Sequence, residues 1–273
     1  MYTRHICVSA HEKIADISRE NSGITAMLSE LAAECAADGR KVVAVAEKDG
    51  RRYFTAGSYC GFACLADGTL IEILPPVGSS AAYARNVLCA EFCRRCGHKF
   101  SPADMRPDSN FLEYVISVFA GETMKIIKSG VLSNYTSCEE NLTSVQGTIL
   151  FAENIRRNLV HRERIYVRHD IFTPDRAENR IIKAAASMFM KLTADSRSSH
   201  LLKEALSFLD DVKLPFDPAA EFSKCINTRN TKKYSTILSI CRMLFDRNEG
   251  TALSGKYISC AQFYKMTIKK PRK

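Results

Sequence analysis

The chain has 273 residues with a formal net charge of +9, and its composition of 46% hydrophobic and 25% charged residues excludes disordered and fibrous classes. No apolar run approaches the ~20 residues needed to cross a bilayer, and the start lacks the charged head and apolar core of a secretion signal. We therefore expect an intracellular, cytoplasmic protein without membrane contact, built as one large domain or two modest ones.

Residues 1–76 predict a small β-rich N-terminal module. Asp-Gly pairs at residues 49–50 and 67–68 each lie between apolar runs. Such pairs are strong hairpin signals, because these turns need a left-handed backbone that Gly adopts freely. Between Asn21 and Gly39, apolar residues recur at helical spacing, which predicts a helix covering one face of the sheet.

Residues 77–250 predict a helical body. Apolar residues recur at helical spacing in five segments, which are residues 81–96, 110–128, 177–192, 199–209 and 234–245. Together with the β-rich module before it, this body predicts an α+β fold.

Between residues 129 and 175 the helix signals are weak. The extended runs TILFAENI and IYVRHDIF flank a polar, arginine-rich segment, which predicts a long protruding hairpin or a short helix between two strands. Gly147, before the first run, is typical of a bulge or a close backbone approach. The arginines of this region are Arg156, Arg157, Arg162, Arg164 and Arg168. Such arginines can contact nucleic acid or enter a cleft on a partner. Alternatively, they are the ordinary surface charge of a solvated hairpin.

The eleven cysteines are odd in number and scattered, which is typical of reduced thiols rather than of a disulfide framework. The spacing of Cys89, Cys93 and Cys96 can hold an iron–sulfur cluster, and the last two with His98 can hold zinc. At helical spacing, however, the three cysteines share one face, where Cys packs as a small apolar residue. We expect no metal and no cofactor in this chain.

A nuclease of the PD-(D/E)xK type needs two carboxylates on Mg²⁺ and a Lys two residues after the second. Asp211-Val-Lys213 has the final triplet, but it lies at a predicted helix end before Pro215, and no suitably placed Asp on a strand precedes it. The sequence also lacks a GxxxxGK[ST] phosphate loop and a GxSxG nucleophile turn. We expect no catalytic residues, so that the chain is not an enzyme by itself.

Residues 224–273 contain twelve Lys or Arg and only two acidic residues. Such a stretch attracts phosphate backbones through a sequence-independent term that weakens with salt. One interpretation is a basic C-terminal tail at residues 251–273 that is simply solvated. The alternative is a stand-alone DNA-binding protein, whose candidate contacts are Lys232, Lys233, Lys269 and Lys270.

Five segments carry a likeness to a known family. In chain order they are residues 59–75 ending in IEILPP, GVLSNY at 130–135, QGTILFAENIR at 146–156, AENRIIK at 177–183 and NTKKYSTILSI at 230–240. Their order and spacing resemble those of the McrC family, a subunit of methylcytosine-specific McrBC restriction systems. Together they cover most of the chain.

The resemblance implies a partner of McrB, a hexameric AAA+ GTPase, whose ring is threaded by a finger that stimulates GTP hydrolysis. Here the finger corresponds to residues 135–172. Partner contact is expected at Asn154, Ile155, Arg156 and Arg157. Support for the finger is expected from Tyr135, Gly147, Phe151, Asn179 and Arg180, with Asn179 capping a helix and Arg180 bridging backbone carbonyls. GTP and Mg²⁺ belong to the partner.

McrC proteins normally continue into a Mg²⁺-dependent nuclease domain that cuts DNA. We expect this chain to be a truncated or divergent McrC-like regulatory subunit that ends before that domain. It then contacts DNA indirectly or through its basic C-terminal region. The tripeptide at 146–148, Gln-Gly-Thr, departs from the Lys-Gly-Arg that family members tend to have in the finger.

Overall fold

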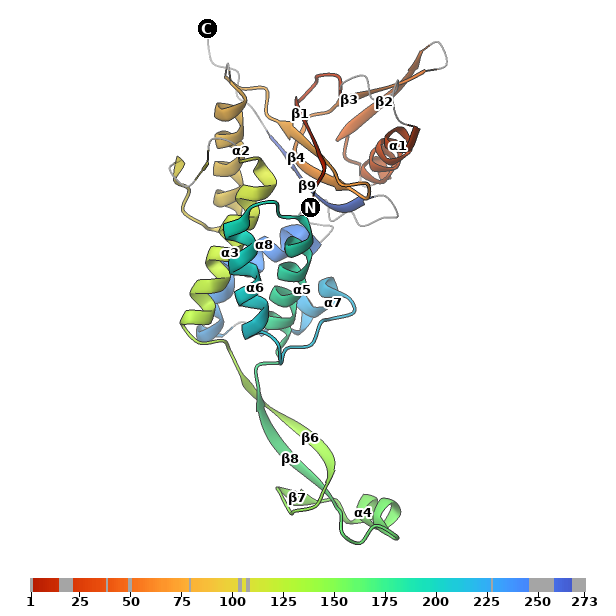
Figure 1. Cartoon of the computed structure of the whole chain (residues 1–273), viewed down its shortest axis with the longest axis vertical. Coiled ribbons are helices and arrows are strands. Elements are labelled where there is room, and N and C mark those ends of the chain that lie inside the picture. Colours follow the sequence, from red (N-terminus) through yellow and green to blue (C-terminus); the bar gives the residue numbers. More distant parts are fainter. Residues whose placement is uncertain are drawn as a thin grey trace.

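The structure, a computed structural model, describes residues 2–14, 22–37, 39–48, 51–78, 80–102, 105–106, 109–226, 228–245 and 258–266. It combines helices with mixed β-sheets, which confirms the predicted α+β class. Three parts follow one another along the long axis: an N-terminal sheet, a helical body and a finger (Figure 1).

A four-stranded sheet lies at the end of the molecule opposite the finger (Figure 1). Its strand order is β1 (Arg4–Ser9), β5 (Thr69–Leu74), β4 (Tyr59–Leu65) and β9 (Ile258–Lys265). β1 runs parallel to β5, whereas the other neighbours are antiparallel. Every residue of β5 is buried, since the sheet is covered on both faces.

Helix α1 (Ser22–Ala37) and the hairpin of β2 (Val43–Lys48) and β3 (Arg51–Ala56) lie on one side of this sheet (Figure 1). The helical body covers the other side. The predicted helix between residues 21 and 39 and the two hairpins are therefore confirmed.

Residues 258–265 were expected in a basic tail, and this expectation is wrong. They form β9, whose side chains include the almost completely buried Phe263 and Tyr264. The charges around this segment hid a short apolar run of the kind that forms a buried strand. The N-terminal sheet is thus completed by a strand from near the end of the sequence. The predicted N-terminal module, residues 1–76, therefore lacks one strand of its sheet. Lys269 and Lys270 lie outside the described residues.

In the residues that the structure describes, the body has five longer helices and a few short turns. The helices are α2 (Ala81–Cys96), α3 (Phe111–Lys128), α5 (Ala177–Leu192), α6 (Ser196–Phe208) and α8 (Ser235–Phe245). The short elements are α7 (Pro218–Glu221), η3 (Phe222–Lys224) and η4 (Arg229–Tyr234). The long helices match the predicted segments to within three residues at each end, because their apolar faces form the core.

The finger leaves the body between α3 and α5. It consists of β6 (Asn134–Leu142), a short β7 (Thr148–Ile149), helix α4 (Phe151–Asn158) and β8 (Ile165–Thr173). β8 lies between the other two strands. The run TILFAENI was expected to be extended, but only its first residues are strand and the rest begins α4. Both forms predicted for this region are present, since β6 and β8 make a long protruding hairpin and the short helix α4 lies between strands.

Candidate functional site

The finger projects well beyond the body (Figure 1). Its long strands, β6 and β8, pair antiparallel from Asn134↔Thr173 at the base to Leu142↔Ile165 near the tip. Each strand has nine residues, which at ~3.3 Å per residue spans about 30 Å. Almost all of β6 and much of β8 is exposed or half-buried, so this ribbon has little core of its own.

A small asparagine network holds α4 on the strands. The side-chain oxygen of Asn154 accepts hydrogen bonds from the Tyr166 backbone N–H at 2.8 Å and from the Asn158 amide at 2.7 Å. Asn158 and Asn141 of β6 exchange two further hydrogen bonds of 2.8 Å. Asn154 therefore faces inward and is engaged within the finger, which differs from the exposed contact expected for it.

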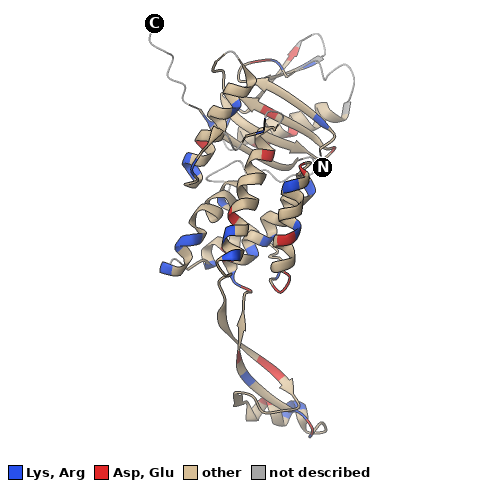
Figure 2. Cartoon of the chain, turned by 60° about the vertical axis from the view of Figure 1, so that its left-hand side comes forward, with Lys and Arg blue, Asp and Glu red and all other residues tan. Residues whose placement is uncertain are grey.

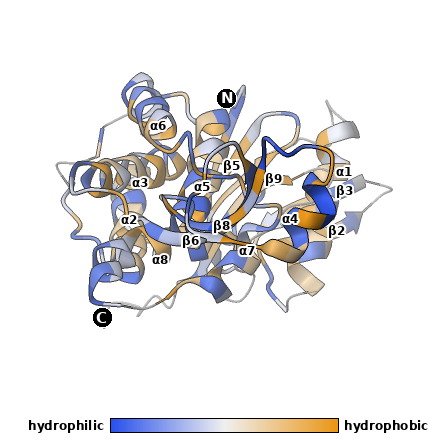
Figure 3. Cartoon of the chain, turned by 90° about the horizontal axis from the view of Figure 1, so that it is seen from below, coloured by the Kyte–Doolittle hydropathy of each residue, from blue (hydrophilic) through white to orange (hydrophobic). Residues whose placement is uncertain are grey.

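One face of α4 is apolar and open to solvent. Phe151, Ile155 and Leu159 follow one another at intervals of four residues and are 70%, 66% and 71% exposed, with Val160 beside them. Figure 3 looks at the finger from its tip and shows hydrophobic and hydrophilic residues on the same helix. Phe151 was expected to support the finger, but it points outward. Sequence reasoning missed Leu159 and Val160, although the four-residue spacing of Leu159 from Ile155 was a usable signal.

Arg156 and Arg157 both pair with Glu153, at 3.1 and 3.0 Å. The Arg157 guanidinium also lies over the Tyr166 ring, 4.8 Å from its centroid. These are surface contacts of small energy, so the two guanidinium groups remain able to exchange Glu153 for a partner's carboxylate. Residues of both signs lie along the finger (Figure 2), including the pair of Arg168 and Glu139 at 2.6 Å.

Gly147 lies against the backbone of β8. Its φ angle is +70°, and a Cβ at this position would lie 2.3 Å from the backbone oxygen of Arg168. The predicted close backbone approach is therefore confirmed, and only Gly fits there without a shift.

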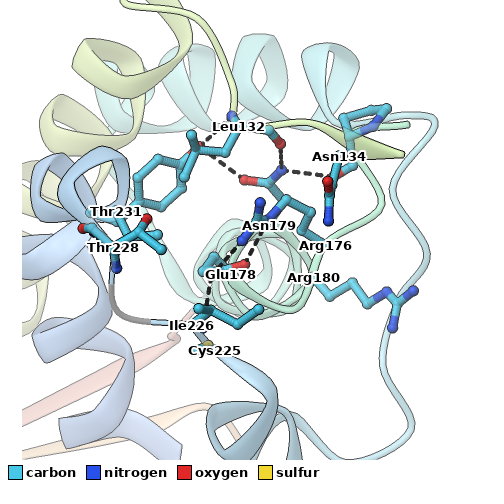
Figure 4. A network of polar contacts seen from close by, with 12 residues as sticks. Leu132, Asn134, Arg176, Glu178, Asn179, Arg180, Cys225, Ile226, Thr228 and Thr231 are labelled. Atoms are coloured by element: carbon cyan, nitrogen blue, oxygen red, sulfur yellow. Dashed lines mark hydrogen bonds and ion pairs between the residues drawn. The ribbon is translucent and has the colours of Figure 1, made fainter. Parts of the chain in front are cut away.

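At the base of the finger, Asn179 joins both strands (Figure 4). Its buried amide donates to the backbone oxygens of Leu132 at 2.8 Å and Pro174 at 2.7 Å, and its oxygen accepts from the Tyr234 hydroxyl at 3.0 Å. Tyr234 in turn accepts from the Leu132 N–H at 2.9 Å. The expected helix cap is wrong, because Arg176 occupies the cap position of α5 and Asn179 bonds the segments flanking β6 and β8.

Arg180 fixes the same base from the other side. It donates to both carboxylate oxygens of Asp175, at 2.7 and 2.8 Å, and to the Asp175 backbone oxygen at 3.2 Å. The carboxylate also accepts the Lys213 N–H at 3.0 Å. The hydrogen bonds from Arg180 outweigh burial and lower the pKa of Asp175. The bridge from Arg180 to a backbone carbonyl is present as expected.

Tyr135 and Phe172 form the next layer of the finger above this base. They are opposite each other across β6 and β8, with ring centroids 5.1 Å apart in a tilted arrangement. Cross-strand aromatic pairs of this kind stabilise a ribbon. Both rings are nevertheless mostly exposed, so this pair also presents apolar surface.

Of the basic residues named as DNA contacts, Lys232 and Lys233 lie in the described part of the chain, next to each other in η4, and both are exposed. The Lys233 ammonium lies at the C-terminal end of α3, 3.2 Å from the Ser129 hydroxyl and 2.5 Å from the Gly130 oxygen. This is a favourable place for a cation, since the end of a helix carries partial negative charge.

Against known families, a model described as "McrBC 5-methylcytosine restriction system component" matches residues 54–268, well over half of the chain. The chain belongs to this McrBC family. The match takes in most of the N-terminal sheet, the helical body and the whole finger, and it confirms the resemblance read from the sequence.

A curated McrBC relative is the "Type IV methyl-directed restriction enzyme EcoKMcrBC" of Escherichia coli (strain K12). It is 23% identical over 154 residues, which cover 55% of this chain and 44% of the relative, so the chain spans less than half of that protein's length.

Two solved structures share the McrBC fold of this chain. One is the cryo-EM structure of the Thermococcus gammatolerans McrBC complex, with a TM-score of 0.70 and 19% identity over 96% of this chain and 83% of that one. The other is the half-complex of T. gammatolerans McrB AAA+ hexamers with bound McrC, from a tetradecameric assembly. Its TM-score is 0.69, at 20% identity over 96% of this chain and 67% of that one.

In this McrBC chain the three clustered cysteines are buried in the face of α2 that packs on the core. The Cys93 sulfur lies 3.1 Å from the Tyr114 hydroxyl oxygen, and burial raises the pKa of Cys96 to about 12. Within the described ranges, no three His, Cys, Asp or Glu side chains are grouped so that they could hold a metal ion. No helix among the same residues is long and apolar enough to span a bilayer.

Asp211 and Lys213 lie in the exposed connection after α6, not on a strand. The backbone of Lys213 serves the base of the finger through its bond to Asp175. In the McrBC fold this triplet therefore helps to hold the base of the finger, a role that its resemblance to a nuclease motif did not indicate.

Proposed function

We propose that this chain is an McrC-like regulatory subunit that inserts its finger into the central opening of a McrB-type AAA+ GTPase ring and stimulates GTP hydrolysis. The observation that carries the proposal is the finger: a ribbon about 30 Å long, fixed at its base by Asn179 and ending in a helix with an exposed apolar face. The solved relative described as McrB hexamers with bound McrC supports this choice of partner.

The tip has two kinds of side chain that can bind the inner wall of a ring. Burial of a large apolar side chain such as Ile155 contributes roughly 1.5–3 kcal/mol. Arg156 and Arg157 add guanidinium groups that recognise carboxylates in a defined geometry. GTP and Mg²⁺ are bound by the partner, and this chain acts by positioning side chains against it.

The proposed role is regulatory, and DNA cleavage is not assigned to the described residues. Asp211 and Lys213, which resembled part of a nuclease motif, lie in an exposed connection that anchors the finger. The DNA-binding alternative has weaker support, because no feature of the described residues points to DNA in the way that the finger and the McrB-bound relative point to the ring.

GTP turnover tests the proposal. The chain is mixed with the McrB-type GTPase of the same genome, and we expect turnover to rise. Ile155→Ser should reduce the stimulation about tenfold, which is the loss of about 1.4 kcal/mol of apolar contact. Arg156→Ala should reduce it less, because this side chain is exposed and already paired.

The control is Val45→Ser, an exposed apolar residue on β2 at the opposite end of the molecule, which should leave the stimulation unchanged. Unchanged turnover on mixing, with or without these substitutions, contradicts the proposed function.

A further inference from the structure

Helix α4 begins where the pairing of β7 with β8 ends, at the tip of the finger (Figure 1). The next hydrogen bond, of 3.0 Å, runs from the Leu150 N–H to the backbone oxygen of Tyr166 in β8. The Tyr166 N–H points to the same edge of β8, and there it donates to the side-chain oxygen of Asn154. The Asn154 carboxamide thus takes the place of a strand partner on the part of this edge that β7 does not reach.

The orientation of all three amides in the network follows from this one N–H. A backbone N–H can only donate, so the atom of Asn154 that faces Tyr166 is the oxygen. The Asn158 atom 2.7 Å from this oxygen must then be the amide nitrogen. The Asn158 oxygen is left to accept from Asn141, while its nitrogen also donates to the Asn141 oxygen. The three side chains therefore fit one another in a single arrangement.

This network fixes the rotation of α4 about its own axis. Asn154 and Asn158 are four residues apart and share one face of the helix, and Asn158 is almost completely buried against the ribbon. Successive residues of a helix point about 100° apart, so Ile155 turns outward when Asn154 turns inward. Which side chains α4 offers to solvent is thus set by the residues that it directs toward β6 and β8.

The position of Arg157 depends on the same bonds. Its guanidinium lies over the ring of Tyr166, the residue whose N–H is bound by Asn154. Loss of the Asn154 oxygen therefore frees both α4 and the strand residue on which Arg157 rests. The apolar and the cationic groups of the tip are held by one network of amides.

We propose that Asn141, Asn154 and Asn158 are positioning residues for the stimulation of GTP hydrolysis. They act by holding α4 in the rotation that presents Ile155 and Arg157 to the GTPase, and Asn154 does so without touching this partner. The inference rests on the proposed function and deepens it. An eight-residue helix is too short to be stable alone, so its orientation has to come from contacts of this kind.

Aspartate substitutions separate positioning from direct contact. Both bonds of Asn154 use its oxygen, so Asn154→Asp keeps the acceptor for Tyr166 and Asn158, whereas Asn154→Ala removes it. Asn158 instead donates to two oxygens, and Asn158→Asp replaces this donor with a group that cannot donate. The network therefore tolerates aspartate at position 154 and not at position 158. Asn230→Ala, at an exposed position in η4 of the body, is the control.

Maximal GTP turnover of the McrB-type GTPase of the same genome is measured at saturating chain, beside amide hydrogen exchange at Tyr166. Asn154→Ala and Asn158→Asp should lower the stimulated turnover about 10- to 100-fold, because small misplacements of positioned groups are costly. They should also speed exchange at Tyr166 at least about tenfold. Asn154→Asp and Asn230→Ala should leave both quantities close to those of the unaltered chain. Thermal unfolding should stay within about 2 °C for all four variants, since the ribbon has little core of its own.

An Asn154→Ala chain that stimulates like the unaltered chain overturns the inference. So does an Asn154→Asp chain that fails to stimulate while Tyr166 stays protected, because the amide nitrogen of Asn154 is then needed at the partner. If Asn154→Asp loses stimulation and Tyr166 protection together, stimulation still follows the Tyr166 bond and the inference stands. An unaltered chain that does not stimulate at all overturns the proposed function, and this inference with it.

Discussion

Asn179 ties the base of the finger to the body. Its carboxamide bonds the residues just before β6 and just after β8, and its oxygen is bound by Tyr234 of the body. A buried amide with all these partners is stable, whereas backbone oxygens left without a donor cost about 1–3 kcal/mol. Asn179 therefore helps to fix the direction in which the finger leaves the body, together with the bonds of Arg180 to Asp175 and of Tyr234 to Leu132.

Replacing Asn179 with Leu, which has a similar volume but no donors, should lower the free energy of unfolding by about 2–3 kcal/mol. Urea denaturation followed by circular dichroism measures this change. Asn230→Leu, at an exposed position nearby in η4, serves as the matched control and should change stability by less than about 0.5 kcal/mol. Equal effects of the two substitutions would show that the Asn179 bonds contribute little.

Glu72 is a second residue that joins several elements. Its fully buried carboxylate accepts two hydrogen bonds of 2.8 Å from Arg85, one of 3.1 Å from His5 and one of 2.8 Å from the Phe111 N–H. Burial raises the pKa of Glu72, but the hydrogen bonds from Arg85 and His5 outweigh burial and lower the pKa to about 2. The ionised side chain thus connects β1, β5, α2 and α3.

This low pKa makes stability depend on pH with a definite sign. The folded protein holds Glu72 ionised, and the unfolded chain protonates it near 4.5, so its contribution is complete above about pH 5 and is lost as pH falls toward 2. The difference in unfolding free energy between the unaltered chain and Glu72→Gln should shrink, by on the order of 3 kcal/mol, from pH 6 to pH 2.5.

Denaturant unfolding at several pH values measures this difference. Glu140→Gln on the exposed shaft is the control, and its difference from the unaltered chain should stay near zero throughout. A Glu72→Gln difference that is the same at both ends of the pH range would contradict the assignment.

Among the elements, α4 depends most on its surroundings. A helix of this length is marginal in water, and it persists because Asn154 and Asn158 bond it to β8 and β6. The arginines and the β-prone run before them are evident in the sequence. The asparagine network is not, because Asn141, Asn154 and Asn158 contact one another and Tyr166 only in the folded finger.

Gly147→Ala should loosen β7 specifically. The added methyl group meets the Arg168 backbone oxygen, so the pairing of Thr148 with Arg168 is strained or lost. Amide hydrogen exchange should speed up at least tenfold at Thr148 and Ile149 while that of α3 and α5 is unchanged. Gly121→Ala, at an unstrained helical position with open space, is the matched control and should leave exchange in the finger as it is.

For the whole molecule, the parts predicted best are those set by local periodicity. The helices at 81–96 and 177–192 match residue for residue, because their apolar faces repeat along the sequence. What sequence reasoning missed depends on distant partners. β9 was hidden among basic residues, and the role of Asn179 requires Leu132 and Pro174 to lie side by side.

The candidate site has parts that local sequence predicts and parts that depend on distant contacts. A protruding hairpin was predicted from two strand-like runs around a polar segment, although most of the first run is helix α4 and strand β6 was not predicted. The limits of the finger came from the family resemblance. Which tip residues face solvent could not, since that depends on how α4 docks. Ile155 points outward as expected, whereas Asn154 turns inward and Leu159 extends the exposed face.

The position of β9 also bears on how this protein is made. β4 has β5 on one side from early in synthesis, but its other edge stays unpaired until residues 258–265 have left the ribosome. An open strand edge invites pairing with other chains. The helical body and the finger are thus synthesised before β9 can complete the N-terminal sheet. A nascent chain paused ahead of this strand is exposed to aggregation for the length of the pause.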